Sequence, residues 1–201
     1  QAVDLETGAI IAVTTHSGAT GDTTSIQETL PTAGELIADE IATPTSKGKY
    51  EVNQESIEEV VTDKGYHSNK ILAAVNEMGV RSYISEPDRG RRNWKGKEDQ
   101  KEIVYANRRR MKGDRGKSLV RQRAEKVERP FAHLFGRSKM RRLHIRGLQN
   151  VRKRCLLLAV GFNLALLTRS ILGSGTPKEF SDRRISLFLT LLRVMARISA
   201  W

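Results

Sequence analysis

The sequence predicts a mixed α/β fold that carries a basic insertion and C-terminal helices. In the first 88 residues, apolar runs of strand length alternate with stretches whose apolar residues recur at helical spacing, as in a sheet covered by helices. A basic stretch follows, and helical spacing then returns over two long segments. The chain has 201 residues, of which 38% are apolar, which suits one core and is too little for two well-packed ones.

Residues 1–88 supply the expected sheet. Pro31 and Gly34 are expected to kink or split the first helix, because proline lacks the amide hydrogen and glycine weakens a helix. The second helix has Ser68 at its start and Gly79 just beyond its end, which are typical helix boundaries. The expected elements, in chain order, are a hairpin of residues around 3 and 9–15, a helix over 23–41, a strand over 57–62, a helix over 68–78 and a strand over 80–85.

The remaining residues divide into three parts. Residues 89–118 are rich in basic residues and glycine and indicate a flexible insertion or linker with an exposed Trp94. Residues 119–178 contain two helices, over about 118–135 and 148–172, and residues 179–201 form a tail that could make one more amphipathic helix. The longest apolar run has about a dozen residues, short of the roughly 20 that cross a bilayer, so no membrane association is expected.

Charge is distributed very unevenly along the chain. Residues 1–88 carry 5 Lys+Arg and 15 Asp+Glu, net −10, whereas residues 89–154 carry 24 and 6, net +18. Such a basic stretch favours nucleic acid as a partner, because each neutralised phosphate releases counterions. A merely solvated basic surface is the alternative. The single cysteine, Cys155, excludes an internal disulfide framework and favours a cytoplasmic location.

Asp63 is the first candidate for chemistry. It follows the expected strand over 57–62 and precedes a Lys-Gly turn, so it lies at the end of a sheet where α/β proteins bind ligands. A carboxylate there could hold a metal ion. An aspartate before Lys-Gly is also ordinary turn or helix-cap chemistry, and the pattern does not decide between the two.

Glu128 is the second candidate. It is expected to lie beside the apolar stripe of its helix, among basic neighbours. A salt bridge to Arg121 or Lys126 would explain it without function. The alternative is a metal ligand that acts together with Asp63.

Five segments in the same order resemble the DDE transposases of bacterial insertion sequences, over about residues 1–178. These segments are Thr-Asp-Lys-Gly-Tyr-His-Ser at 62–68, Asn-Arg-Arg-Arg-Met-Lys-Gly at 107–113, Arg-Ala-Glu-Lys-Val-Glu-Arg-Pro-Phe-Ala-His at 123–133, Met-Arg-Arg-Leu-His-Ile-Arg-Gly at 140–147 and Phe-Asn-Leu at 162–164. The resemblance implies a ribonuclease-H-like catalytic sheet in residues 1–88, completed by the helices of residues 119–178. It also implies DNA transposition as the function, acting on transposon ends and target DNA in the bacterial nucleoid, and it is compatible with a homodimer.

In that family two aspartates and a glutamate hold two divalent metal ions, Mg²⁺ or Mn²⁺. The second aspartate corresponds to Asp63, and the glutamate corresponds to Glu128, with Glu125 as the alternative. A metal pair held by carboxylates stabilises both the attacking and the leaving oxygen of a phosphoryl transfer. The residues expected to contact DNA are Arg108, Arg109, Arg110, Arg121, Arg123, Lys139, Arg141 and Arg142.

The chain departs from the family pattern at two places. The first catalytic aspartate of the family lies on a strand upstream of the hairpin, and no residue here corresponds to it, since Asp4 matches the hairpin turn. The chain is therefore expected to be an N-terminally truncated transposase without activity. The lysine that many relatives carry beyond the glutamate is also replaced, by Phe135. A non-catalytic nucleic-acid-binding protein and a nuclease of similar fold are the competing functions.

Overall fold

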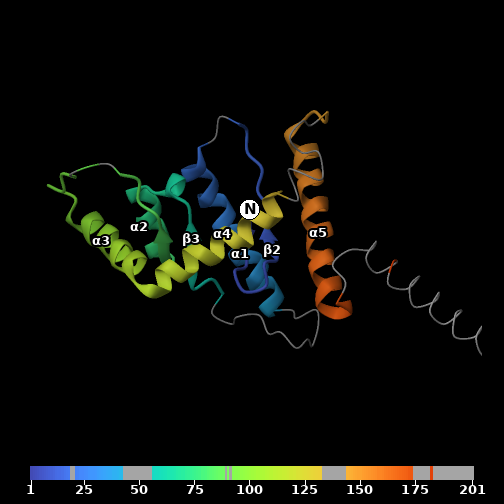
Figure 1. The fold of residues 1–201 in the computed structure, drawn as a ribbon. Coiled ribbons are helices and arrows are strands. Elements are labelled where there is room, and N and C mark those ends of the chain that lie inside the picture. The colour runs from blue at the N-terminus through green and yellow to red at the C-terminus, as the bar shows by residue number, and fades with distance from the viewer. Residues whose placement is uncertain are drawn as a thin grey trace, which may run out of the picture.

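The computed structural model describes residues 1–18, 21–42, 56–88, 90, 92–132, 144–173 and 182. Short strands are combined with five longer helices among these residues, as expected for a mixed α/β chain (Figure 1). The elements, in chain order, are β1 (Ala2–Val3), β2 (Ile10–Ala12), α1 (Asp22–Ala42), β3 (Glu59–Thr62), the 3-10 turn η1 (Lys64–Tyr66), α2 (Asn69–Glu77), β4 (Arg81–Ile84), α3 (Glu98–Lys112), α4 (Asp114–Ala132) and α5 (Leu148–Leu172).

The strands form two separate pairs. β1 and β2 make the expected antiparallel hairpin, in which Ala2 lies opposite Ala12 and Val3 opposite Ile10. Its turn is held by Asp4, whose Oδ2 accepts hydrogen bonds from the backbone N–H of Thr7 at 2.7 Å and from its hydroxyl. β3 and β4 are parallel, and α2 connects them. Among the described residues no strand joins the two pairs.

The first helix is continuous, so the expectation that Pro31 and Gly34 would split α1 was wrong. Pro31 lies inside the helix, which buries Ile26, Leu30 and Ala33 along one side. Ile26 and Leu30 belong to the main core cluster, and this tertiary packing outweighs the local cost of a proline.

The main core lies where α1, α2 and α3 meet β4. Its most deeply buried members are Ile71, Leu72, Ile84 and Val104, each at most 2% exposed. Ser68 caps α2 as expected, because its hydroxyl accepts the N–H of Ile71 at 3.1 Å.

The stretch 89–118 is not simply an insertion or linker. Residues 98–112 form α3, which packs on α2, α4 and β4 and buries Val104 and Asn107. Besides Glu98 and Asp99 of its first turn, its 15 residues include six charged ones, and these obscure a narrow apolar stripe. Trp94, expected to be exposed, is half-buried and packs against the main core.

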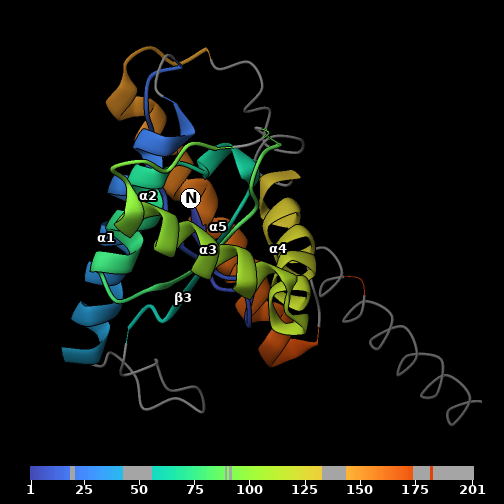
Figure 2. The ribbon, with the colours of Figure 1, turned by 90° about the vertical axis from the view of Figure 1, so that its left-hand side faces the viewer.

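The last two helices form as expected. α4 begins a few residues before the predicted start, and α5 ends at Gly173, whose φ of 64° is the left-handed conformation that glycine adopts readily. Figure 2 shows α3 and α4 in front of α5 when the molecule is turned by 90°. The predicted tail helix over 179–201 lies outside the described residues, except for residue 182.

Residues 148–171 of α5 are long and apolar enough to cross a membrane by length and composition alone, and little of this stretch is buried. The sequence expectation considered only the uninterrupted apolar run and therefore missed it. One such helix is weak evidence for a span, because core helices of soluble proteins meet the same criterion.

Candidate active site and basic surface

Asp63 stands at the C-terminal end of β3, where the chain turns into η1. Its backbone is extended, with φ −75° and ψ 166°, and its Oδ1 accepts the N–H of Lys64 at 2.6 Å. The side chain is exposed. The carboxylate is therefore a cap for the turn, one of the two roles that the sequence left open, while no described residue binds its second oxygen. Tyr66, just beyond, is half-buried against the main core.

Glu128 lies on the exposed side of α4. The half-buried side of this helix carries Val120, Ala124 and Val127, and Glu128 follows Ala124 by four positions, so it borders that side from the solvent. No ion pair joins it to Arg121 or Lys126 among the described residues, and the Lys126 ammonium instead donates to the carbonyl of Glu6 at 3.3 Å. One exposed row of α4, at spacings of three and four, consists of Asp114, Lys117, Arg121, Glu125 and Glu128.

α4 packs on β3 and β4, so the elements that carry Asp63 and Glu128 are neighbours. Among the described residues there is no group of three or more His, Cys, Asp or Glu side chains arranged to hold a metal ion. These residues alone therefore do not fit a complete two-metal centre. That Asp63 and Glu128 share a metal stays a prediction.

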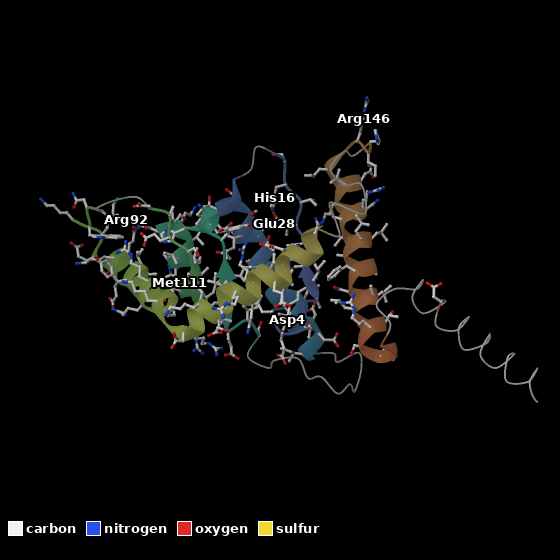
Figure 3. All side chains as sticks on the ribbon, viewed as in Figure 1. Asp4, His16, Glu28, Arg92, Met111 and Arg146 are labelled. Atoms are coloured by element: carbon white, nitrogen blue, oxygen red, sulfur yellow. The ribbon has the colours of Figure 1, made fainter. Side chains whose placement is uncertain are left out.

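A compact ion-pair cluster lies beside the C-terminal end of β4. The Arg108 guanidinium contacts Glu86 through two hydrogen bonds, with Nε 2.5 Å from Oε2 and Nη2 2.9 Å from Oε1, and Arg92 Nη2 lies 2.9 Å from the same Oε1. The hydrogen bonds from Arg108, followed by the charge of Arg92, hold the pKa of Glu86 below its ordinary value despite its burial. Figure 3 shows Arg92 at the end of the molecule that bears α3.

Two aromatic side chains stand next to this cluster. Trp94 and Tyr105 make an edge-to-face contact with ring centres 6.3 Å apart. Arg92 lies over Trp94, and Arg108 and Lys101 lie over Tyr105 at 4.8 and 6.0 Å. These contacts help to fasten the segment after β4 to α3.

The arginines expected to contact DNA occupy different environments. Arg108 is bound to Glu86, and Arg110 donates to the carbonyl and hydroxyl of Ser82 at 3.0 Å each, so both serve the packing of α3 on the β4 region. Arg109 and Arg121 are exposed, and Arg123 is half-buried. Lys139, Arg141 and Arg142 lie outside the described residues.

Two further exposed cations of α3, Lys101 and Lys112, were not among the residues expected to contact DNA. They share one row of the helix with Tyr105 and Arg108, at spacings of four, three and four. That spacing was the available signal, but it lies in a stretch whose basic and glycine-rich composition predicts a linker.

Two findings come from comparison with known proteins. Residues 85–168 match the family model described as a transposase DDE domain. The matched segment contains α3, α4 and Glu128, whereas Asp63 lies before it. No curated protein and no solved structure matches the chain.

Proposed function

We propose that this chain, whose residues 85–168 belong to the transposase DDE domain family, binds DNA through the exposed basic side chains of α3 and α4 in the course of DNA transposition. The family match carries the link to transposition. The charge of the matched region supports DNA as the ligand, because polyanions are attracted to a surface rich in Lys and Arg. The resemblance of the motifs to bacterial insertion sequences favours the bacterial nucleoid as the place of action.

The basic side chains available to bind DNA are those that form no ion pair with a carboxylate of the protein. Arg115 is bound to Glu59 through two hydrogen bonds and Arg108 is bound to Glu86, so neither is free to exchange partners without cost. Lys101, Arg109, Lys112 and Arg121 are exposed and make no ion pair in the described part of the chain. We infer that these four provide the phosphate contacts on this surface.

The test is a titration of duplex DNA at several salt concentrations. Affinity should fall steeply with salt, and each of the substitutions Arg109→Gln, Lys112→Gln and Arg121→Gln should reduce the slope of log K against log salt by about 0.9, the release expected per phosphate contact. Lys70→Gln, an exposed lysine of α2 in the acidic third, is the matched control and should leave the slope unchanged. If all four substitutions reduce the slope equally, the exposed basic side chains of α3 and α4 have no special role in DNA binding.

We further propose that Asp63 and Glu128 contribute two carboxylate ligands to a catalytic Mg²⁺ or Mn²⁺ site. The position of Asp63 at the end of β3 and the packing of α4 on that strand support this, as does the oxygen of Asp63 that no described residue binds. Because the described residues do not assemble three donors, at least one further ligand must come from elsewhere. Mg²⁺ is typically held by few protein carboxylates together with substrate phosphates.

A titration with Mn²⁺ in the presence of DNA tests this assignment. Binding is measured as the decrease of the electron paramagnetic resonance signal of the free ion. Asp63→Asn and Glu128→Gln should each weaken Mn²⁺ binding by roughly tenfold or more, because each removes a charged ligand. Glu125→Gln is the matched control on the same row of α4. If Glu125→Gln alone has an effect, the role passes to Glu125. If none of the three does, while DNA still binds, the chain is a non-catalytic DNA-binding protein.

We also infer that the two strand pairs belong to one ribonuclease-H-like sheet. α1 packs on β1, β2 and η1, and α4 packs on β3 and β4 while Lys126 reaches the turn of the hairpin, so the same two helices bridge both pairs. β1 and β3 each pair with a strand along one edge only among the described residues. A crystal structure of a chain extended by the sequence encoded upstream tests the inference, which requires a strand between β1 and β3.

A further inference from the structure

Glu86 leaves the second strand pair at the same end as Asp63. β3 and β4 are parallel and Thr62 lies opposite Ile84, so the residues that follow these two emerge side by side from one end of the pair. The end of β4 is itself fixed, because Asn107 of α3 binds both backbone groups of Ile84. A group bound to Glu86 is therefore anchored next to the turn that Asp63 begins.

Glu86 binds two guanidinium groups in a half-buried position. Its side chain is 20% exposed and that of Arg92 is 13% exposed, and Oε1 of Glu86 lies 2.9 Å from Nη2 of Arg92 and 2.9 Å from Nη2 of Arg108. Contacts between ionised groups are stronger than neutral hydrogen bonds, and the loss of one partner leaves a charge desolvated and unpaired. Glu86 therefore holds both arginines firmly at the end of β4.

Arg92 extends this contact to the start of α2. Its Nη1 donates to Oδ1 of Asn69 at 3.2 Å, and Nδ2 of Asn69 donates to Oε1 of Gln100 in α3 at 2.9 Å. Asn69 is the first residue of α2 and follows the cap residue Ser68. One guanidinium thus ties the beginning of α2 to Glu86, in a region where α2 and α3 pack side by side (Figures 1 and 2).

Five residues separate Asp63 from Asn69, and the turn η1 between them contains no buried residue. Two backbone hydrogen bonds of 3.1 Å hold this segment, from the N–H of Tyr66 to the carbonyl of Asp63 and from the N–H of His67 to the carbonyl of Lys64. The hydrogen-bond geometry of a 3-10 turn is poorer than that of an α-helix. The shape of η1 therefore depends strongly on the two elements that it joins, β3 and α2.

His67, which follows η1, also lies near Glu86. The pKa of Glu86 is lowered first by the hydrogen bonds from Arg108 and, among weaker effects, by the charge of His67. His67 is 1% exposed, so its side chain is enclosed by the same region of the fold. Glu86 thus stands beside the end of η1 as well as beside the start of α2.

We propose that Glu86 is a positioning residue for Asp63, because it fixes the start of α2 through Arg92 and Asn69 and thereby sets the shape of η1. Oδ1 of Asp63 accepts the N–H of Lys64 at 2.6 Å, so the orientation of the whole carboxylate follows the turn. The inference rests on the proposed role of Asp63 as a metal ligand. Groups that orient a metal ligand typically change metal affinity by roughly 10- to 100-fold when they are removed.

A titration with Mn²⁺ tests the proposal, with Glu59→Gln as the matched control. Glu59 is also a half-buried glutamate bound by two hydrogen bonds from an arginine, Arg115, but it lies at the opposite end of β3. With DNA at a saturating concentration, Glu86→Gln and Asn69→Ala should each weaken Mn²⁺ binding by about tenfold, whereas Glu59→Gln should leave it unchanged. Thermal unfolding of each variant establishes that it is folded. Equal losses of Mn²⁺ affinity in Glu86→Gln and Glu59→Gln would give Glu86 a general structural role and overturn the proposal.

The backbone amide of Lys64 gives a second measurement that needs no metal. Its proton is bonded to Oδ1 of Asp63, so its chemical shift in a nuclear magnetic resonance spectrum reports the position of the carboxylate. The shift should change in Glu86→Gln and in Asn69→Ala and stay the same in Glu59→Gln. An unchanged shift in the first two variants would overturn the proposal.

Asp63→Asn, titrated with Mn²⁺ in parallel, separates this proposal from the metal assignment. If Asp63→Asn weakens Mn²⁺ binding and Glu86→Gln does not, the positioning role is wrong while the metal site stands. If Asp63→Asn leaves Mn²⁺ binding unchanged, Asp63 is not a metal ligand, and the Lys64 amide alone decides whether Glu86 positions the carboxylate.

Discussion

Two asparagines close the outer edges of the two strand pairs. Asn107 of α3 accepts the N–H of Ile84 at 3.0 Å and donates to its carbonyl at 2.8 Å, and Asn163 of α5 makes the same pair of bonds with Ile10. Each amide thus satisfies the backbone groups that a further strand would otherwise pair. Both residues occur in the motifs that carry the family resemblance, but the motifs alone did not indicate this role.

Asn107→Ala should therefore destabilise the fold. Asn107 is 1% exposed, so the substitution leaves the N–H and the carbonyl of Ile84 buried without partners, and the free energy of unfolding should fall by about 2–4 kcal/mol. Urea denaturation measures the change. Asn150→Ala, at an exposed asparagine of α5, is the control and should change the stability by no more than about 0.5 kcal/mol. Equal stability of the two variants would show that the bonds to Ile84 contribute little.

At the scale of elements, local signals located most boundaries. Ser68 and Gly173 delimit helices through a side-chain cap and a left-handed glycine, chemistry that depends only on neighbouring residues. Pro31 led to a wrong expectation, because proline destabilises a helix locally whereas the helix α1 is stabilised by its tertiary packing. α3 was missed because Val104 and Asn107 meet β4 and α2 only in the folded chain. The candidate site is harder to predict from sequence, since the side of α4 that faces solvent depends on that same packing, and the pairing of Asp63 with Glu128 stays a prediction.

The junction of α3 and α4 requires a residue without a side chain at position 116. A Cβ on Gly116 would lie 2.2 Å from the carbonyl oxygen of Arg110 and 2.9 Å from the Cα of Met111, both of them backbone atoms that cannot move aside alone. Gly116→Ala should force the two helices apart and lower the free energy of unfolding by about 1–3 kcal/mol.

Gly161→Ala is the matched control for this helix substitution. Gly161 lies in α5 with no atom within 4 Å of an added Cβ, so alanine should raise the stability by about 0.5–1 kcal/mol through its better helix propensity. The midpoint temperature of thermal unfolding should therefore fall for Gly116→Ala and rise for Gly161→Ala, relative to the wild-type chain. A stabilising Gly116→Ala would mean that α3 and α4 do not approach as closely as described.

At the scale of the whole molecule, burial is concentrated on one side. Among the residues that the structure describes, the main core cluster joins α1, α2, β4 and α3 through seven buried apolar residues, whereas only Ile10 and Ala159 are buried in the cluster between the hairpin and α5. Local stability follows the apolar surface that each part buries. The hairpin and α5 should therefore open more readily than the region around β4.

Hydrogen exchange read by mass spectrometry can separate the two clusters. In the wild-type chain, amides of α2, β4 and α3 should exchange more slowly than those of β2 and α5. Leu72→Ala removes a fully buried side chain of the main cluster and should lower the free energy of unfolding by about 2–5 kcal/mol, speeding exchange throughout the molecule. Ile10→Ala should speed exchange in β1, β2 and α5 while leaving α2 and β4 protected, because its contacts lie in the smaller cluster. If Ile10→Ala speeds exchange in α2 and β4 as much as in the hairpin, the two clusters unfold as one unit, and α1 and α4 then couple them more tightly than their burial indicates.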